Sequence, residues 1–184
     1  SYIFKHKPLK HVDIGSRLDG FVSHVASFRE IEVFDIRPIT TQIPGIIFKQ
    51  ADLMNLGDSY GINSYCDSLS CLHAIEHFGL GRYGDPIDND AYVFGFINLA
   101  KGLSINGTMY LSVPIGIERV EFNANRVFDP HTIIKLSLTQ NLKLVEFHII
   151  DSHSKVIKIN PLDENEISNL RTLDYNLGMF IFKK

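Results

Sequence analysis

Along the chain, apolar residues fall into short segments of two kinds, and the two kinds alternate. Runs rich in Val, Ile and Phe that end at Gly, Pro or Asp are typical of strands. Strands are expected at residues 11–15, 32–35, 46–53, 67–73, 108–114, 142–151 and 177–183. Apolar residues at helical spacing or helix boundary signals predict helices at residues 21–28, 90–103 and 131–139. Strands that alternate with helices favour an α/β fold, in which helices cover a parallel sheet.

The last two expected strands are long and apolar, so we expect them to pair at an edge of the sheet. Between them, residues 163–171 (DENEISNLR) predict a short surface helix, whereas residues 155–160 stay open as a possible extra strand. Neither a linker nor an internal repeat divides the 184 residues. We therefore expect one domain that spans residues 1–184.

Charge and composition argue against several classes of function. The chain has 18 basic and 21 acidic residues, for a net charge of −3, and shows no concentrated basic face for nucleic acid. Its apolar runs are too short to span a bilayer, and its start does not resemble a secretory signal. Cys66 and Cys71 have neither a disulfide framework nor a metal-binding spacing, so we expect buried thiols in a cytoplasmic protein. The oligomeric state stays open.

The loop after the first expected strand carries unusual charge for a nucleotide-binding turn. In open α/β sheets, ligands bind beyond the carboxyl ends of the strands. There the chain reads DIGSRLDG, in which Gly15 allows a sharp turn, but Arg17 stands where a dinucleotide fingerprint needs a second glycine. Asp13 and Asp19 would repel a pyrophosphate and suit a ligand that carries an ammonium and a sulfonium. The alternative is a simple tight turn.

Two further carboxylates follow the next two strands. Asp35 ends the second strand, where a carboxylate can accept hydrogen bonds from both hydroxyls of a ribose. Its alternative role is a salt bridge to Arg37. Asp52 follows the third strand and is placed to accept a hydrogen bond from an adenine amino group, with Leu53 beside the ring. Asp52 taken alone could also be a helix cap.

These segments together resemble a class I S-adenosylmethionine-dependent methyltransferase. The resemblance rests on HVDIGSRLDG, EVFDIRP, QADL, SLSCLHAIEH and GLSINGTMYLSVP. Through EHFGLGRYGDPID and FNANRVFDP the chain also resembles a bacterial methyltransferase-like family of unknown function. The resemblance implies a Rossmann-like, doubly wound, mostly parallel sheet of seven strands with an antiparallel C-terminal hairpin. It also implies S-adenosylmethionine as the cofactor, bound by Asp13, Gly15, Ser16, Asp35, Asp52, Leu53 and His73.

His73, Glu76 and His77 spell H-x-x-E-H, a pattern that can bind zinc. Zinc binding needs a helix of several turns, but an expected strand runs directly into the motif and glycines follow it closely. At most about two helical turns fit there. We therefore assign no metal. Some methyltransferases with a related Glu-His segment use a divalent ion, so an ion bound by Glu76 and His77 stays an alternative.

Methyl transfer to a hydroxyl group needs a base that removes the proton. His77 is the first candidate, and Asp85 is assigned with it to the catalytic group. The alternative for His77 is a hydrogen bond to a neighbouring loop. Two loops, GLGRYGDPID and FNANRVFDP, are expected to converge over a polar acceptor such as a sugar or nucleotide-sugar. We assign acceptor binding to Arg82, Asn123 and Arg126. The alternative is that each arginine pins its loop by an ion pair, with Asp85 or Asp129.

Two other functions stay under consideration. Arg17 and the long first loop also suit a degenerate methyltransferase fold that serves as a non-catalytic binding or partner protein. A nicotinamide-dependent enzyme is disfavoured, because the second glycine is missing and the loop is acidic. The predicted function is thus O-methylation of a polar small molecule or carbohydrate by a cytoplasmic enzyme without a nucleic-acid partner.

Overall fold

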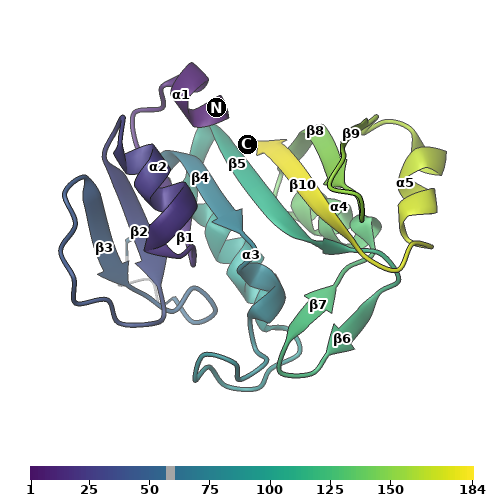
Figure 1. Cartoon of the computed structure of the whole chain (residues 1–184), viewed down its shortest axis with the longest axis horizontal. Coiled ribbons are helices and arrows are strands. Elements are labelled where there is room, and N and C mark those ends of the chain that lie inside the picture. Colours follow the sequence, from purple (N-terminus) through teal and green to yellow (C-terminus); the bar gives the residue numbers. More distant parts are fainter. Residues whose placement is uncertain (57–60) are drawn as a thin grey trace.

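One mixed β-sheet runs through the molecule, and helices pack on both of its faces (Figure 1). The computed structural model describes residues 1–56 and 61–184. The strands of this sheet are β1 (His11–Ile14), β2 (Ile31–Asp35), β3 (Ile46–Gln50), β4 (Cys66–Leu72), β5 (Leu103–Ile115), β8 (Lys143–Ile150), β9 (Val156–Ile159) and β10 (Asn176–Lys183). Within the described residues they lie in the order β3-β2-β1-β4-β5-β10-β8-β9.

This order confirms the predicted doubly wound fold. Strands β1 to β5 are parallel, whereas β10 runs antiparallel to both β5 and β8. The last two predicted strands do pair with each other, but β10 lies inside the sheet and β8 is not an edge. The segment left open in the sequence forms β9, which pairs with β8 and gives the described sheet eight strands where seven were expected.

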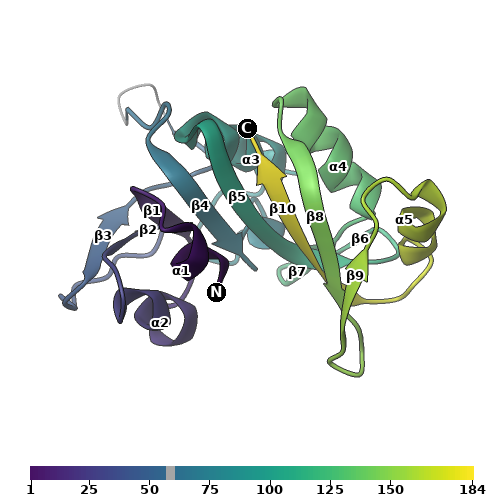
Figure 2. The ribbon, with the colours of Figure 1, turned by 90° about the horizontal axis from the view of Figure 1, so that it is seen from above.

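The sheet separates the core into two layers, and helices cover each layer. The helices are α1 (Tyr2–His6), α2 (Ser23–Ala26), α3 (Ala91–Gly102), α4 (Pro130–Thr139) and α5 (Glu164–Leu170). Figure 2 shows α1 and α2 on one side of the sheet and α3 with α4 on the other. Val25 of α2 packs with Ile31 and Val33 of β2, while Phe96 of α3 belongs to the larger cluster on the opposite face. Alternate residues of β2 therefore serve different layers.

Two helices begin at aspartates, as their sequences predict. Asp129 accepts a hydrogen bond from the backbone N–H of His131, and Pro130 occupies the first turn of α4. Asp163 accepts from the N–H groups of Asn165 and Glu166 at the start of α5. These contacts satisfy amide groups that the helix itself leaves without partners. The helix expected at residues 21–28 is shorter: α2 covers only Ser23–Ala26, and the turn η1 (Leu18–Val22), in which Asp19 and Gly20 have non-helical angles, precedes it.

Backbone hydrogen bonds join the carboxyl ends of neighbouring parallel strands, so that these ends lie at the same edge of the sheet. The N–H of Gly15 donates to Phe34 O at 2.8 Å, and that of His73 donates to Ser112 O at 3.0 Å. Strand order changes direction between β1 and β4, which is the switch point where doubly wound sheets bind ligands. The loops that start at Gly15 and His73 therefore leave the sheet side by side.

A small hairpin projects near this edge. It consists of β6 (Arg119–Glu121) and β7 (Asn125–Val127), which pair antiparallel. No hairpin was expected here, because three-residue strands are too short to show a period. In the part of the chain that the structure describes, no helix is long and apolar enough to cross a membrane.

The aromatic stack under β8 and β10 tests the core. Phe180 is 1% exposed, and its ring centroid lies 4.4 Å from that of Phe147. The ring of Phe182 also stacks on it, at 5.9 Å. We predict that Phe180→Ala lowers the free energy of unfolding by about 3–5 kcal/mol. Phe122→Ala, at a position 71% exposed, should change it by less than about 0.5 kcal/mol. Urea denaturation measures both, and equal effects would contradict this packing.

Candidate functional site

A cavity of about 450 Å³ opens beyond the carboxyl ends of β1, β2, β3 and β4. This volume lies in the range of small-molecule sites. Eight of the twelve predicted site residues line it, namely Gly15, Ser16, Asp35, Asp52, Leu53, His73, His77 and Asp85. Asp13, Arg82, Asn123 and Arg126 do not. The cavity thus lies at the strand ends where a ligand site was expected, while the roles of individual residues stay predictions.

The first loop approaches the fourth strand too closely for any side chain at position 15. Gly15 has φ +76°, and a Cβ placed there would lie 2.7 Å from the Cβ of Ala74. A side chain would therefore be strained and would also clash. Arg17, at the cavity mouth, pairs with Asp19 at 2.8 Å, and its side chain is 79% exposed. Arg17 therefore does not fill the cavity.

Asp13 lies behind the cavity wall in a buried polar network. Its carboxylate accepts hydrogen bonds from the Ser70 hydroxyl at 2.5 Å and from the N–H of Ser16 at 3.2 Å. Because the Ser70 proton is used, Ser70 Oγ accepts from Nε2 of His11, and Ser68 donates to Nδ1 of the same ring. Asp13 therefore positions the Ser16 loop from beneath.

Burial shifts the two titrating groups of this network in opposite directions. Burial raises the pKa of Asp13 to about 6, although hydrogen bonds from Ser70 and Ser16 oppose the shift. Burial lowers the pKa of His11 to about 3, and the nearby Arg29 adds to this shift. A neutral His11 agrees with a ring that donates at one nitrogen and accepts at the other.

Asp35 is paired with Arg37, as the alternative interpretation of the sequence allowed. Asp35 Oδ1 accepts from the backbone N–H of Arg37 at 2.8 Å and from its Nε at 2.9 Å, while Nη2 donates to Oδ2. Nη2 also donates to the carbonyl of Gly15 at 3.3 Å. The guanidinium lies 5.0 Å from the ring of Tyr83, so Arg37 connects the first, second and fourth strand-end loops.

The far end of the cavity has apolar walls and one carboxylate. Phe34, Ala51 and Leu53 are buried and line it. Asp52 accepts a hydrogen bond from the N–H of Met54 at 2.9 Å, which fixes the turn after β3. Asn98 of α3 donates to Leu53 O at 2.8 Å and holds this wall in place. A flat apolar ring with a polar edge suits such a slot.

The H-x-x-E-H motif forms the single turn η3 (Ile75–His77), not a long helix. Nδ1 of His73 lies 2.9 Å from Oε1 of Glu76, and Nε2 of His77 lies 3.9 Å from the same oxygen. Glu76 is 1% exposed, and its Oε2 has no hydrogen-bond partner among the described residues. Within residues 1–56 and 61–184, no three His, Cys, Asp or Glu side chains are grouped as metal ligands.

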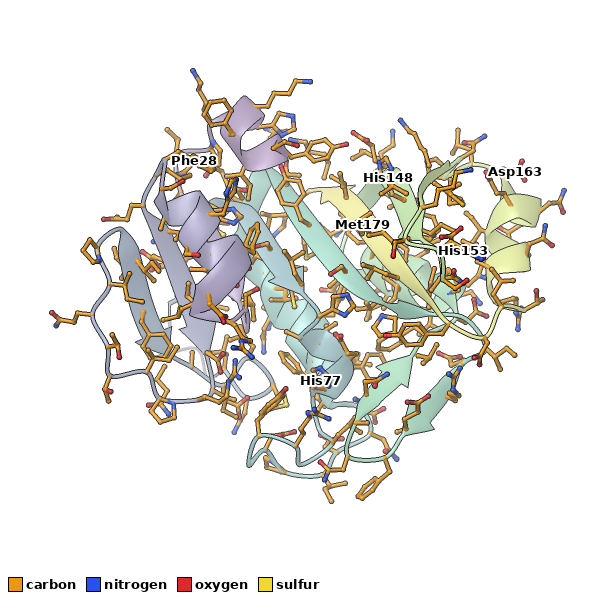
Figure 3. All side chains as sticks on the ribbon, in the orientation of Figure 1. Phe28, His77, His148, His153, Asp163 and Met179 are labelled. Atoms are coloured by element: carbon orange, nitrogen blue, oxygen red, sulfur yellow. The ribbon has the colours of Figure 1, made fainter. Side chains whose placement is uncertain are left out.

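His77 is held in one tautomer by the hairpin. Its Nδ1 lies 2.6 Å from the carbonyl oxygen of Ala124. A carbonyl oxygen only accepts, so Nδ1 carries the proton and a neutral ring keeps its lone pair on Nε2. Figure 3 shows His77 at the carboxyl edge of the sheet beside β7, far from His148 and His153. The loop contact foreseen as an alternative role is therefore present, and it leaves Nε2 able to take a proton.

Asp85 and Arg126, which were predicted to act in catalysis and acceptor binding, mainly hold loops in place. Asp85 is buried and accepts from the N–H groups of Tyr83 at 3.0 Å and Gly81 at 3.2 Å. Arg126 is 4% exposed and donates to the carbonyls of Phe78, Asp88 and Asn89, and burial lowers the pKa of its guanidinium. Arg126 thus fastens the hairpin to the loop of residues 79–88 through carbonyl groups.

Arg82 lies on the outer surface of the same junction. It is exposed, and its Nη1 donates to Asn123 O at 3.2 Å and to Ala124 O at 3.5 Å. Arg82 and Asn123 therefore meet next to the carbonyl that anchors His77, although neither lines the cavity. In the described part of the chain, neither Arg82 nor Arg126 forms an ion pair with the aspartate of its own loop.

Sequence reasoning missed two cavity residues that matter here. Arg37 was noticed only as a partner of Asp35, and nothing in the pattern placed its guanidinium over the cavity. Tyr83 was not assigned at all, yet its ring packs edge-on against His77 at 5.7 Å and lies 5.0 Å from the guanidinium of Arg37 and 5.8 Å from that of Arg82. A lone tyrosine in a glycine-rich loop carries no period from which its direction could be read.

Solved structures share this fold at low sequence identity. A SAM dependent methyltransferase from Archaeoglobus fulgidus has a TM-score of 0.65 and 16% identity, over 100% of this chain and 90% of that one. The 1,6-didemethyltoxoflavin-N1-methyltransferase of Burkholderia thailandensis, solved with S-adenosylhomocysteine, has a TM-score of 0.61 and 11% identity, over 100% of this chain and 76% of that one. The [4+2]-cyclase SpnF has a TM-score of 0.66 and 9% identity, over 95% of this chain and 75% of that one. The chain therefore has the class I methyltransferase fold, and SpnF shows that this fold also supports another reaction.

Family comparison places the chain more narrowly. A family model described as "Caenorhabditis protein of unknown function, DUF268" matches residues 43–181, which is more than half of the chain. The chain belongs to the DUF268 family. The matched segment contains Asp52, His73, His77 and the hairpin, while Gly15 and Asp35 precede it. No curated protein sequence matches the chain.

The buried network gives a pH-dependent prediction. Folded Asp13 binds a proton up to about pH 6, against 3.8 for the ordinary group, so its titration makes stability fall as pH rises between these values. Folded His11 loses its proton near pH 3 instead of 6.5, so its titration makes stability rise over the same range. In the native protein the two effects oppose each other.

Asp13→Asn should remove only the first effect. Between about pH 4 and 6, unfolding free energy of this variant should rise relative to the native protein by up to about 1.4 kcal/mol per pH unit. Urea denaturation at several pH values measures the difference, in which carboxylates common to both proteins cancel. Parallel pH curves for the two proteins would show that Asp13 does not titrate as described.

Proposed function

We propose that this protein is an S-adenosylmethionine-dependent methyltransferase that methylates an oxygen of a polar small molecule. The single observation that carries the proposal is the cavity at the switch point of a class I methyltransferase fold. It combines a tight turn at Gly15, an apolar slot at Leu53 and carboxylates at Asp35 and Asp52. A cytoplasmic location stays a prediction, supported by the buried, unpaired thiols Cys66 and Cys71.

The chemistry of the cavity fits the proposed cofactor. Gly15 lets its loop pack closely against Ala74, and both residues line the part of the cavity where the methionine portion would lie. Asp35 offers a carboxylate for the ribose hydroxyls, and Asp52 offers one for the adenine amino group. Leu53 and Phe34 supply apolar contact for the adenine ring. Asp13 contributes indirectly, because it holds the N–H of Ser16.

The cofactor, when bound, supplies an activated methyl group with a good leaving group. The residues of the chain would align the acceptor, exclude water and remove a proton. Nε2 of His77 is the proton acceptor in this proposal, because Nδ1 is committed to Ala124 O. The positive charge that results lies 3.9 Å from Oε1 of the buried Glu76, which stabilises it. Asp85 shapes the loop over the site and stays a second catalytic candidate.

A polar acceptor is supported by the groups around His77. Arg82 and Asn123 are exposed at the junction of the hairpin and the loop of residues 79–88. Arg82 retains donors beyond Nη1 that can bind hydroxyl or phosphate oxygens. We therefore keep a sugar or nucleotide-sugar as the proposed acceptor class. Arg126 supports the site by holding these two loops together.

A non-catalytic binding protein is the second candidate, and one observation favours it. The carboxylate that should hold the ribose is covered by Arg37. If Arg37 cannot leave, the cofactor cannot use Asp35. Cofactor binding therefore separates the two candidates.

Titration calorimetry with S-adenosylhomocysteine tests the proposal. The native protein should bind one equivalent, and Asp52→Ala should weaken binding about 10- to 100-fold by loss of a charged acceptor. Asp151→Ala is a matched control, because Asp151 also accepts from the N–H two residues later but lies in another turn. Absence of binding by the native protein would overturn the proposed function, and equal effects of the two variants would remove Asp52 from the site.

The base can be tested in an acceptor screen with sugars and nucleotide-sugars, in which mass spectrometry detects the added methyl group. His77→Gln should slow methyl transfer by about 10²-fold or more and leave affinity for S-adenosylhomocysteine nearly unchanged. His148→Gln is the control, since both histidine side chains are 19% exposed but His148 does not line the cavity and lies away from His77 (Figure 3). Equal rates for the two variants would remove His77 from the mechanism.

A further inference from the structure

The carboxylate of Asp35 is almost fully committed to one neighbouring residue, Arg37, whose guanidinium and backbone N–H both donate to it. The Asp35 side chain is 3% exposed, whereas that of Arg37 is 40% exposed. Oδ1 already accepts two hydrogen bonds from Arg37, and Oδ2 accepts a third. A carboxylate has about four lone-pair positions in all. Two ribose hydroxyls would therefore compete with the guanidinium for the same oxygens.

The position of the guanidinium makes this competition steric as well as electrostatic. Arg37 lines the cavity, and its Nη2 reaches from Asp35 to the carbonyl of Gly15. The space between these two groups is where a ribose would connect the adenine slot to the methionine end. Arg37 therefore occupies the centre of the proposed ligand path, in contrast to Arg17, which pairs with Asp19 at the exposed mouth.

We infer that Arg37 is an internal competitor for the ribose subsite. In the closed arrangement it covers Asp35, and it must swing away before an adenosyl ligand can use that carboxylate. This inference rests on the proposed function, because it assumes an adenosyl ligand. The observed affinity then equals the affinity of the open arrangement multiplied by the fraction of molecules that are open.

Release of Arg37 also changes the loop over the site. The same guanidinium lies against the ring of Tyr83, whose edge contacts His77. When Arg37 leaves Asp35, the loop of residues 79–88 loses its contact with the second strand end. Entry of the ribose is in this way linked to the loop that carries the acceptor-side residues.

Partial exposure allows the competitor to leave. An ion pair with one exposed partner is held by only a modest net free energy and is weakened by salt. Proline at position 38 restricts the backbone directly after Arg37, so the movement is expected in the side chain. Arg37 thus lowers affinity without closing the site permanently.

The test is titration calorimetry of S-adenosylhomocysteine with Arg37→Met, which keeps a long side chain and removes the charge. We expect binding about three- to tenfold tighter than in the native protein. Arg17→Met is the matched control, because Arg17 also pairs with an aspartate two residues away and borders the same cavity. It should stay within about twofold of the native affinity. Arg37→Lys, which keeps the charge but loses the bidentate fork, should be intermediate.

Salt supplies a second readout. Between low and high NaCl, affinity of the native protein should increase toward that of Arg37→Met, whereas the affinity of the variant should stay nearly constant. Thermal unfolding checks that each variant is folded, and Arg37→Gln replaces Arg37→Met if the latter is not.

The outcomes separate this inference from the proposed function. If the native protein binds and Arg37→Met binds equally or more weakly, Arg37 is no competitor and only the inference fails. If Arg37→Met binds and the native protein does not, the inference that Arg37 covers the ribose subsite is supported, and the proposed function of the native protein fails. If neither protein binds, the proposed function fails, and the inference fails with it.

Discussion

The junction of β1 with β4 is the constraint on which the site depends. Here the strand order reverses, and the Ser70 hydroxyl of β4 donates to Asp13 of β1 at 2.5 Å. Just beyond the ends of these strands, Gly15 and Ala74 approach so closely that only a glycine fits. The buried hydrogen bond fixes the positions of the two strands relative to each other, and Gly15 allows the two loops to diverge beyond the strand ends. The floor of the cavity is a consequence of these two contacts.

Charges around the cavity are more fully paired than their number in the sequence indicates. Asp35 is bound by Arg37, Asp19 by Arg17, and Asp85 by two backbone amides. The cavity is therefore not an open cluster of anions awaiting a cation. A ligand has to exchange partners with groups that are already satisfied, and its affinity reflects the difference between two sets of contacts. For this reason Arg37, which gives no signal in the periodic pattern of the sequence, is central to the ligand exchange that we propose.

Most of the fold could be read from the sequence, because it follows from periodic burial. Strand β4 and helix α3, for example, were predicted to within one residue at each end. The hairpin of β6 and β7 and the strand β9 were missed or left undecided, since three or four residues define no period and their pairing depends on distant segments. The lengths of these segments alone do not show whether they form strands.

The candidate site divides in the same way. Gly15, Asp35 and His77 were located by chain order, because carboxyl ends of parallel strands share one edge. Arg126 was expected on the acceptor but is buried against carbonyl groups of the loop opposite. A side chain's partner across a loop contact depends on the path of two segments far apart in sequence, and no local signal records it. Strand ends could therefore be predicted, and contacts between loops could not.

Strand β9 has an effect beyond its small contribution to the sheet. Without it, the whole of β8 would be the edge of the sheet, whereas β9 pairs with its apolar second half, Phe147 to Ile150. With it, the outermost strand is only four residues long and carries Lys158, next to Lys155 just before its start. A short, positively charged border offers a poor template for another molecule's strand, so this addition protects the protein against edge-to-edge aggregation.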